Sequence, residues 1–252
     1  KPVVAIKSGV TASGSRAVSS HTGSLAGSEA AYRAGFAQAG VLQVNSMEAL
    51  FDYALAFAYQ PLLKGDRIGI VTNAGGPGIL ATDALERARM LIPRLAPETV
   101  EALSPKLPGE ASVANPVDVL GDATAERYDD ATRLVLAVPN VDGLLVILTP
   151  QAVTEIEETA HVVGRNAQGS EKPVLACFMG EARIKAGIEI LRQYGVPNYP
   201  YPDRAAAALA AMSGYRRERE GPVGVGEGWQ GWKSEVEGLV EGVGAGGRVA
   251  GG

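Results

Sequence analysis

Strand-like and helix-like segments alternate along this sequence, and this alternation constrains the fold more than any other feature. Three nearly continuous apolar runs, at residues 67–72, 143–148 and 173–178, read RIGIVT, GLLVIL and PVLACF. Such continuity is expected for strands that helices cover on both faces. Helical patterns separate the runs, which predicts parallel strands joined by right-handed crossovers. The predicted fold class is therefore α/β, with doubly wound parallel sheets.

The alternation divides into two units of unequal size. Residues 1–62 contain two predicted strands, at 3–7 and 41–44. One helix is predicted from Ser28 with Gly40 as its stop, and Asn45-Ser46 is predicted to cap the next. Two short strands bury too little surface to stand alone. We therefore expect only half of a domain here.

Residues 63–218 contain about five predicted strands, the last at 196–199, enough for a complete doubly wound domain. The helices predicted between and after them include residues 152–166 and 202–215. Residues 219–252 are rich in glycine and are predicted to be a linker.

Composition argues against several classes of function. The chain has 252 residues and a formal net charge of −5, which disfavours a nucleic-acid partner because phosphate backbones attract basic surfaces. No apolar run approaches the length of a membrane span, so we expect no membrane partner. The single cysteine, Cys177, excludes an internal disulfide and fits a reducing compartment such as the cytoplasm. We expect Cys177 to be a structural residue of a buried strand.

A glycine-rich segment, TNAGGPG at residues 72–78, joins the strand at 67–72 to a helix. Its glycines leave backbone amides uncovered, and Pro77 suits the first helical turn. A helix start with free amides binds anions such as phosphate. A tight strand-to-helix turn that binds nothing fits these residues equally well. No Lys-Ser/Thr pair follows the glycines, so the segment is not a P-loop.

His21 lies in AVSSHTGSLAGS, residues 17–28, where the small side chains predict a loop before a helix that begins at Ser28. No acidic residue or second histidine is spaced to complete a metal site, so we predict no metal. A solvent-exposed loop histidine is one interpretation. The other is a nucleophile, because a neutral imidazole attacks phosphorus near pH 7 and the glycine-rich segment offers a separate anion site.

Several motifs, in order, resemble one family. KPVVAIKSGVTASGSRAVSSHTGSLAG resembles the phosphohistidine segment of nucleoside-diphosphate-forming acyl-CoA synthetases, and SHTGSLAG is similar to the form found in the ADP-forming branch. The family includes succinyl-CoA synthetase and the ADP-forming acetyl-CoA synthetases. TNAGGPGILATDALE, ANPVDVLGDA and YGVPNYPYPDRAAAALAAM resemble successive parts of its next domain. The resemblance covers residues 1–217. It implies two flavodoxin-like units, of which residues 1–62 are only the C-terminal half of the phosphohistidine domain and residues 63–218 are a flavodoxin-like ligase domain. Residues 219–252 would be a linker toward an ATP-grasp domain.

The resemblance implies roles for individual residues. His21 would be the histidine that is transiently phosphorylated. The phosphate would be held at a helix start by three glycines, Gly75, Gly76 and Gly78. Asn115 and Asp118, in NPVD, would lie near this site on a loop, and the alternative is that their side chains only cap that loop. His161 matches no family motif and is expected to be an ordinary residue on a helix face.

The implied reaction is the reversible conversion of acyl-CoA, phosphate and ADP into carboxylic acid, CoA and ATP, with Mg²⁺ at the nucleotide. This chain itself would bind no cofactor tightly. A CoA-binding domain and an ATP-grasp domain or subunit would complete the enzyme, which we expect to be an oligomer in the cytoplasm. Because the sequence opens directly on a strand, we expect an internal piece of a longer enzyme that is inactive as a synthetase on its own.

Two other functions fit parts of the sequence. One is a non-catalytic regulatory region, such as the synthetase-like part fused to a lysine acetyltransferase. The presence of His21 favours the enzyme over this alternative. The other is a flavodoxin-like module that binds a nucleotide or a protein. Phosphorylation of the full-length protein by acyl-CoA and phosphate would separate the enzyme from both.

Overall fold

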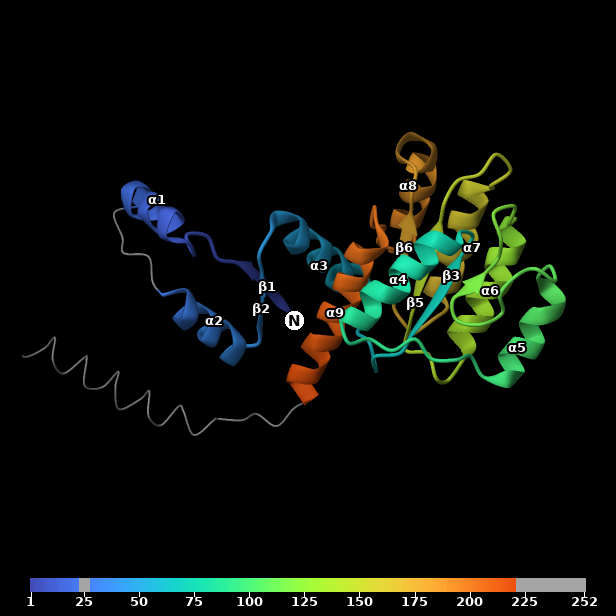
Figure 1. Cartoon of the computed structure of the whole chain (residues 1–252), viewed down its shortest axis with the longest axis horizontal. Helices are drawn as coiled ribbons and strands as arrows, with labels where there is room; N and C mark the ends of the chain where they lie inside the picture. Colours follow the sequence, from blue (N-terminus) through green and yellow to red (C-terminus); the bar gives the residue numbers. More distant parts are fainter. Residues whose placement is uncertain (23–27, 221–252) are drawn as a thin grey trace, which may run out of the picture. The chain divides into compact units, whose positions relative to one another are not determined.

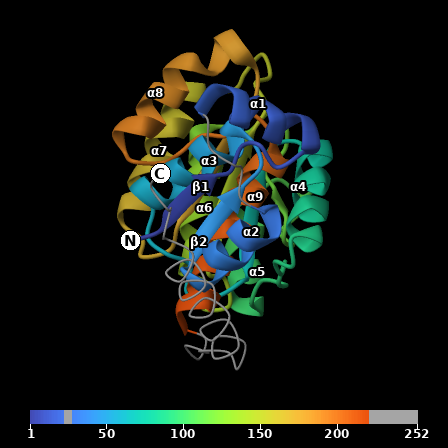
Figure 2. The same ribbon diagram turned by 90° about the vertical axis from the view of Figure 1, so that its left-hand side faces the viewer.

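The computed structural model describes residues 1–22 and 28–220, and every paired strand in this part of the chain is parallel to its neighbour. The first sheet contains β1 (Val3–Ile6) and β2 (Val41–Val44), with Val3 opposite Val41. Between them lie α1 (Ala12–Thr22) and α2 (Glu29–Gln38), and α3 (Met47–Tyr59) follows β2. Figure 2 shows the two strands side by side.

The predicted loop around His21 is wrong over much of its length, because the chain forms α1 there. Gly9 turns the chain with a φ of 75°, and the helix begins just after Thr11. Thr11 Oγ1 accepts a hydrogen bond from the Gly14 amide at 3.1 Å, as an N-cap side chain does. Alanine and arginine in this stretch favour a helix, whereas Gly14 and the serines disfavour one, so residue preferences alone do not predict α1.

The next two helices begin where the sequence predicts. Ser28 is the N-cap residue of α2, and Gly40, with a φ of 64°, follows the end of this helix. Ser46 caps α3 because its Oγ accepts a hydrogen bond from the Ala49 amide at 3.1 Å.

The second sheet has four parallel strands in the order β4–β3–β5–β6. They are β3 (Ile68–Thr72), β4 (Val117–Asp118), β5 (Gly143–Leu148) and β6 (Val174–Phe178). The fifth strand, predicted at residues 196–199, is reduced to one bridge between Ala176 and Asn198. Asn198 Oδ1 accepts the Phe178 amide at 2.7 Å, so a side chain replaces the next backbone bond of the ladder.

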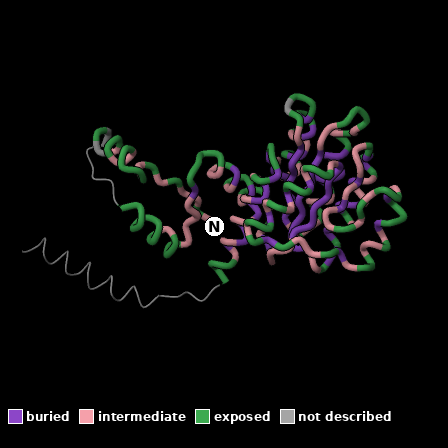
Figure 3. Tube along the Cα trace, viewed as in Figure 1, coloured by how far each residue is buried: buried purple, intermediate pink, exposed green. Residues whose placement is uncertain are grey.

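Helices cover both faces of this sheet (Figure 1). One face packs against α3, α4 (Gly75–Arg87) and α9 (Pro202–Glu220). The other packs against α5 (Pro97–Leu103), α6 (Ala125–Ala137), α7 (Ile156–Gln168) and α8 (Lys185–Gln193). Short 3-10 turns lie at η1 (Ser104–Lys106) and η2 (Glu181–Ile184). Every residue of β3, β5 and β6 is buried, as Figure 3 shows, and this explains their continuous apolar runs.

Two helix boundaries differ from the prediction. The helix predicted from residue 152 begins at Ile156, because the chain first turns with the Gln151 amide bonded to Thr154 Oγ1 at 2.7 Å. The helix predicted over 202–215 extends to Glu220. The predicted linker from residue 219 lies, beyond its first two residues, outside the described part of the chain.

α3 is anchored to the second sheet as well as to the first. Arg204 Nε and Nη2 donate to the two carboxylate oxygens of the buried Asp52, each at 2.7 Å, and the Tyr199 hydroxyl donates to the Asp52 carbonyl at 2.9 Å. Gln60, just after the helix, donates to the Gly195 carbonyl and accepts from the Val174 amide. The predicted domain division after residue 62 therefore falls where contacts with the second sheet have already begun, and it stays a prediction.

Candidate functional site

Two loops at the centre of the second sheet diverge to its opposite faces. β3 and β5 are neighbours, and the segment after β3 leads into α4, which packs Ala81 and Leu85 on one face. The segment after β5 leads into α7, which packs Ala160 and Val163 on the other. Ligands of doubly wound sheets bind beyond the carboxyl ends of strands at such a switch point. The candidate site is therefore the carboxyl edge of β3 and β5, which we call the switch point.

The start of α4 lies at the switch point and leaves amide groups free. Ala74 is the N-cap residue, no side chain caps the helix, and the first helical bond joins the Gly78 amide to the Ala74 carbonyl at 3.1 Å. Gly75 and Gly76 are exposed, and their amides have no hydrogen-bond partner in the described chain. Pro77 has no amide hydrogen, so two donors remain at the positive end of the helix dipole. This arrangement can hold an anion.

Packing requires glycine at only one of the three predicted phosphate-site positions. A Cβ at the buried Gly78 would lie 3.0 Å from Thr72 Cγ2, so a larger residue would push α4 away from β3. A Cβ at Gly75 would lie 3.8 Å from Asp118 Oδ2, which is an ordinary contact. A Cβ at Gly76 would meet nothing within 4 Å. A side chain at Gly76 would therefore fit without strain and compete with an anion for the space beside the free amides.

Asp118 lies beside the start of α4. Its Oδ1 accepts the Leu120 amide at 3.0 Å, while its Oδ2 is directed toward Gly75. Burial, and secondly the charge of Asp118, raises the pKa of Tyr128, whose hydroxyl donates to the Ile147 carbonyl at 2.9 Å. The structure thus brings Asp118 together with the glycine segment, and a role in binding stays a prediction.

Asn115 makes three hydrogen bonds to backbone groups. Its Oδ1 accepts the Ile70 amide at 2.9 Å, and its Nδ2 donates to the Ile68 and Pro93 carbonyls at 2.9 and 3.0 Å. The side chain therefore extends the hydrogen bonding at the edge of β3, as the loop-capping alternative expects. Lining of the site by Asn115 stays a prediction.

The structure places the backbone of His21 in the last turn of α1, and its side chain lies outside the described residues. His21 belongs to the β1–β2 unit, whereas Gly75 and Asp118 belong to the second sheet. Phosphorylation of His21 therefore stays a prediction.

Two family models match consecutive parts of this sequence. The Ligase-CoA domain matches residues 68–221, more than half of the chain, and the succinyl-CoA ligase like flavodoxin domain matches residues 1–57. The chain belongs to the Ligase-CoA family. The resemblance to nucleoside-diphosphate-forming acyl-CoA synthetases and the predicted α/β class with flavodoxin-like units are both confirmed.

Relatives of this Ligase-CoA chain include proteins named as ADP-forming acetate–CoA ligases. It is 42% identical over 218 residues to acetate–CoA ligase (ADP-forming) I of Archaeoglobus fulgidus, covering 86% of this chain and 30% of that protein. It is 42% identical over 216 residues to the alpha subunit of acetate–CoA ligase (ADP-forming) II of Pyrococcus furiosus. This match covers 84% of this chain and 47% of that subunit. The Ligase-CoA chain thus spans less than half the length of these relatives.

A solved structure shares the fold. Acetyl-coenzyme A synthetase 1 of Ca. Korarchaeum cryptofilum, described as dinucleotide forming and in complex with phosphate and ADP, superimposes with a TM-score of 0.81 at 34% identity. The match covers 87% of this chain and 48% of that chain.

The sequence patterns did not indicate how the Ligase-CoA fold joins the two loops of the switch point. Asn73, at the end of β3, is buried and bonds Thr149 three times. Its Nδ2 donates to the Thr149 carbonyl at 2.8 Å, and its Oδ1 accepts the Thr149 amide at 2.8 Å and the hydroxyl at 3.2 Å. An asparagine after a strand is a weak signal, since it also favours turns.

Cys177 and His161 are packed against other side chains and have structural roles. Burial raises the pKa of Cys177 to about 12, so its thiol stays protonated and unreactive. His161 lies on α7, where its ring packs edge-on against Tyr194 and its Nδ1 is 3.3 Å from the Tyr194 hydroxyl.

In the described residues, no three side chains of His, Cys, Asp or Glu are grouped to hold a metal ion. No helix in the same residues is long and apolar enough to cross a membrane.

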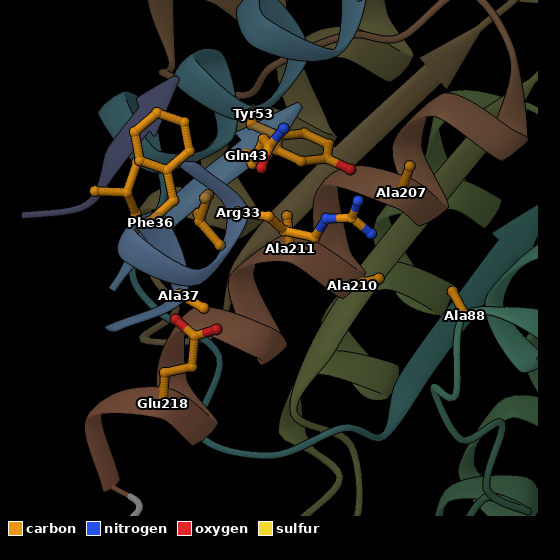
Figure 4. A pocket seen from close by; sticks show the side chains of 12 residues that line it. Arg33, Phe36, Ala37, Gln43, Tyr53, Ala88, Ala207, Ala210, Ala211 and Glu218 are labelled. Carbon is orange, nitrogen blue, oxygen red and sulfur yellow. The ribbon is translucent and has the colours of Figure 1, made fainter. Parts of the chain in front are cut away.

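A cavity of about 520 Å³ lies at the other end of α4 (Figure 4). Its lining includes Ala88, which follows α4, Tyr53 of α3 and three alanines of α9, Ala207, Ala210 and Ala211. Gln43 also lines it, and its Oε1 is buried with no hydrogen-bond partner in the described chain. A helix like α4 is about 20 Å long at 1.5 Å per residue, so this cavity is separate from the switch point.

Proposed function

We propose that this chain is part of an ADP-forming acyl-CoA synthetase, which interconverts acyl-CoA, phosphate and ADP with carboxylic acid, CoA and ATP. The observation that carries the proposal is the uncapped start of α4, with free amides at Gly75 and Gly76, at the switch point of a Ligase-CoA domain. His21, in the succinyl-CoA ligase like unit, supplies the nucleophile. The relatives named as ADP-forming ligases, and the one in complex with phosphate and ADP, support this reaction.

The proposed reaction has three steps. A phosphate oxygen attacks the thioester carbonyl, and the C–S bond breaks to give acyl phosphate and the CoA thiolate. A neutral ring nitrogen of His21 then attacks phosphorus, and the P–O bond to the acyl group breaks to release the carboxylate. In the last step a terminal phosphate oxygen of ADP attacks the phosphoramidate, which breaks the P–N bond and forms ATP.

The start of α4 stabilises charge on the phosphoryl group in the second step. The amides of Gly75 and Gly76 are held in place by the helix and need no reorientation when charge develops, and losing such a donor typically costs ~10²–10³ in rate. Gly78 allows α4 to pack closely on β3 and so aims these amides. Asp118 lines the same site, and Asn115 fixes the start of the segment that leads into β4 and Asp118.

The remaining substrates bind to other parts of the proposed enzyme. We assign CoA to a separate CoA-binding domain, and ADP, ATP and Mg²⁺ to an ATP-grasp domain or subunit. The assembled enzyme is an oligomer and works in the cytoplasm, where CoA and adenine nucleotides are available. The isolated chain should accordingly form no ATP from acetyl-CoA, phosphate and ADP. ATP formation by the chain alone would contradict the assignment of the other sites.

Phosphorylation of the full-length protein tests the proposal. With radiolabelled phosphate and acyl-CoA, or with labelled ATP, the protein should acquire a label that is lost in acid and stable in base, as a phosphoramidate is. His21→Ala should abolish both labels and leave CoA binding intact. Gly76→Val should slow labelling, because its side chain shields the amides, whereas Gly109→Val, at another open position, should not. A label that persists in His21→Ala, or that survives acid, would exclude His21 as the carrier.

A further inference from the structure

Arg89 adopts a backbone conformation that arginine rarely adopts. It follows the end of α4 with a φ of 63°, in the left-handed region where helix ends usually have glycine. The Arg89 amide donates to the Glu86 carbonyl and the Met90 amide to the Leu85 carbonyl, each at 2.9 Å. These two bonds form a Schellman helix end, which requires a left-handed residue at this position. A glycine would adopt it without strain, so the fold itself gives no reason for an arginine here.

The side chain of Arg89 is not held by the rest of the described chain. Arg89 is exposed, and its guanidinium makes no hydrogen bond or ion pair with the described residues. Arg94 is likewise exposed, and its side chain has no partner in the same part of the chain. By contrast, Arg87 on α4 pairs with Asp83 at 3.3 Å. No side-chain interaction of Arg89 within the described chain therefore offsets the strain of its backbone.

Arg89 lines an open cavity of about 620 Å³. The remaining lining residues are Arg67, Glu86, Met90, Leu91, Ile92 and Pro93. The backbone of Leu91 is fixed at the start of β3, because its amide donates to the Asp66 carbonyl and its carbonyl accepts from the Ile68 amide, each at 2.8 Å. Its side chain is nevertheless 58% exposed. One cavity thus presents an apolar side chain on a fixed backbone together with an unpaired guanidinium.

Basic side chains outnumber acidic ones around this cavity. Within the described residues, six arginines and four carboxylates line it, adjoin its lining in sequence or pair with such a residue. The arginines are Arg67, Arg87, Arg89, Arg94, Arg216 and Arg217, and the carboxylates are Asp66, Asp83, Glu86 and Asp142. The chain as a whole has a net charge of −5, so this surplus of positive charge is local.

A short acidic protein segment has the chemistry that this surface would recognise. Its carboxylates would pair with Arg89 and Arg94, and an apolar side chain would pack against Leu91. Protein interfaces combine apolar contacts with arginine in this way. A long polyanion such as a nucleic acid fits less well, because beyond the local surplus it would meet a surface of net negative charge.

We infer that the surface formed by Arg89, Leu91 and Arg94, which we call the Arg89 surface, binds an acidic segment of a partner protein. The strained backbone of Arg89 is retained because its side chain serves this contact. The Arg89 surface lies at the amino-terminal edge of β3, whereas the switch point lies at the carboxyl edge, so its role does not depend on the proposed reaction.

Binding of an acidic peptide to the full chain tests the inference. The probe is a fluorescein-labelled peptide of repeated Glu-Glu-Leu units, and its anisotropy at low ionic strength measures the Kd. Arg89→Gln combined with Arg94→Gln should weaken binding about 10-fold, the loss expected for two exposed ion pairs. Leu91→Ser should also weaken it about 10-fold, because the apolar contact is lost. Glu86→Gln should strengthen binding about twofold, because it removes the unpaired carboxylate of the lining.

The matched control is Arg165→Gln combined with Arg192→Gln, which removes the same charge from exposed positions on α7 and α8. It should leave the Kd within about twofold. Arg89→Gly separates recognition from folding. It should raise the midpoint of thermal unfolding by about 2 °C, because glycine relieves the strain, and still weaken binding about threefold.

Absence of peptide binding would overturn the inference. So would equal weakening in the Arg89 and Arg94 double variant and in the control, since only general charge attraction would then be at work. A lower unfolding midpoint of Arg89→Gly would mean that the arginine serves the fold. An oligonucleotide of equal charge that binds as tightly as the peptide would show that the surface recognises negative charge in general and not a protein segment.

Discussion

The two sheets of this chain have the same connectivity and very different burial. In the second sheet, every residue of β3, β5 and β6 is buried. In the first, β1 has no buried residue, β2 has one, Val44, and α2 has none. Both sheets consist of parallel strands with helical crossovers. Connectivity alone therefore does not create a core, which requires neighbouring strands and helices on both faces.

α3 contacts both sheets, and its side chains show the effect of the difference in burial. We call the first sheet with its helices the first region, and the second sheet with its helices the second region. One side of the helix is held on the second sheet through Asp52 and Ala56. Large apolar residues remain exposed on another side, at Met47, Phe51, Leu55 and Tyr59. A helix that is apolar on all sides is normally buried on all sides. The exposed side of α3 is thus a surface suited to further packing.

Amide hydrogen exchange should show the largest difference between the two sheets. Amides of β5 should exchange only through global unfolding, whereas those of β1 and β2 should exchange through local opening, because a two-stranded sheet is marginally stable. We expect protection at least ~10³-fold higher in β5, since global unfolding of a domain costs about 5–15 kcal/mol. Equal protection in β1 and β5 would mean that the first sheet is as cooperative as the second.

Removal of the ion pair between Asp52 and Arg204, which anchors α3, should have the next largest effect, on the free energy of unfolding. Asp52→Ala leaves Arg204 without its buried partner and should lower the free energy of unfolding by about 3 kcal/mol. Glu48→Ala is the control on the same helix, because Glu48 contacts the same arginine at 3.7 Å but is exposed, and it should cost less than about 0.5 kcal/mol. Urea unfolding measures both. Equal, small effects would show that Asp52 does not anchor α3.

Acid should destabilise the second region through Asp142. Hydrogen bonds from Arg67 lower the pKa of this buried carboxyl, so its contribution to stability is complete above about pH 4 and is lost as pH falls through the lowered pKa. Asp142→Asn should be less stable than the wild type at pH 7, and the difference should shrink below pH 4. Unfolding followed from pH 7 to pH 2 measures this, and a constant difference would contradict it.

Substitution on the exposed side of α3 should have the smallest effect on stability. Phe51 is 61% exposed, so Phe51→Ser should change the free energy of unfolding by no more than about 0.5 kcal/mol. It should also reduce the binding of a dye that reports exposed apolar surface. Phe57→Ser is the control, because Phe57 packs edge-on against Tyr215 at 5.4 Å and its loss should destabilise the chain clearly. Unchanged dye binding by Phe51→Ser would mean that another surface binds the dye.

Local sequence signals predicted most of the elements because their causes are local. Ser46 caps α3 through its own side chain, and Gly40 follows α2 with a positive φ, as its position after the helical pattern indicates. The same reasoning failed at α1, where small residues suggested a loop. There Thr11 provides a cap three residues before Gly14, a signal no stronger than many that do not start helices.

The candidate site was predicted in part. The glycine segment indicated the start of α4, and the structure places Asp118 beside it. The link between the loops after β3 and β5 gave no sequence signal, because it joins Asn73 to Thr149, residues 76 positions apart. Contacts of this range follow from strand order and cannot be deduced from spacing.

By itself, the sequence determined the α/β class, the order of the strands along the chain, the helix start at Gly75 and the family resemblance. These features depend on apolar periodicity, capping residues and short motifs, all of which act over a few residues. The tertiary structure decided the order β4–β3–β5–β6, the divergence of the loops after β3 and β5, and the bonding of Asn73 to Thr149. It also decided that α3 packs on both sheets, because burial depends on which distant segments meet, and no local pattern specifies that.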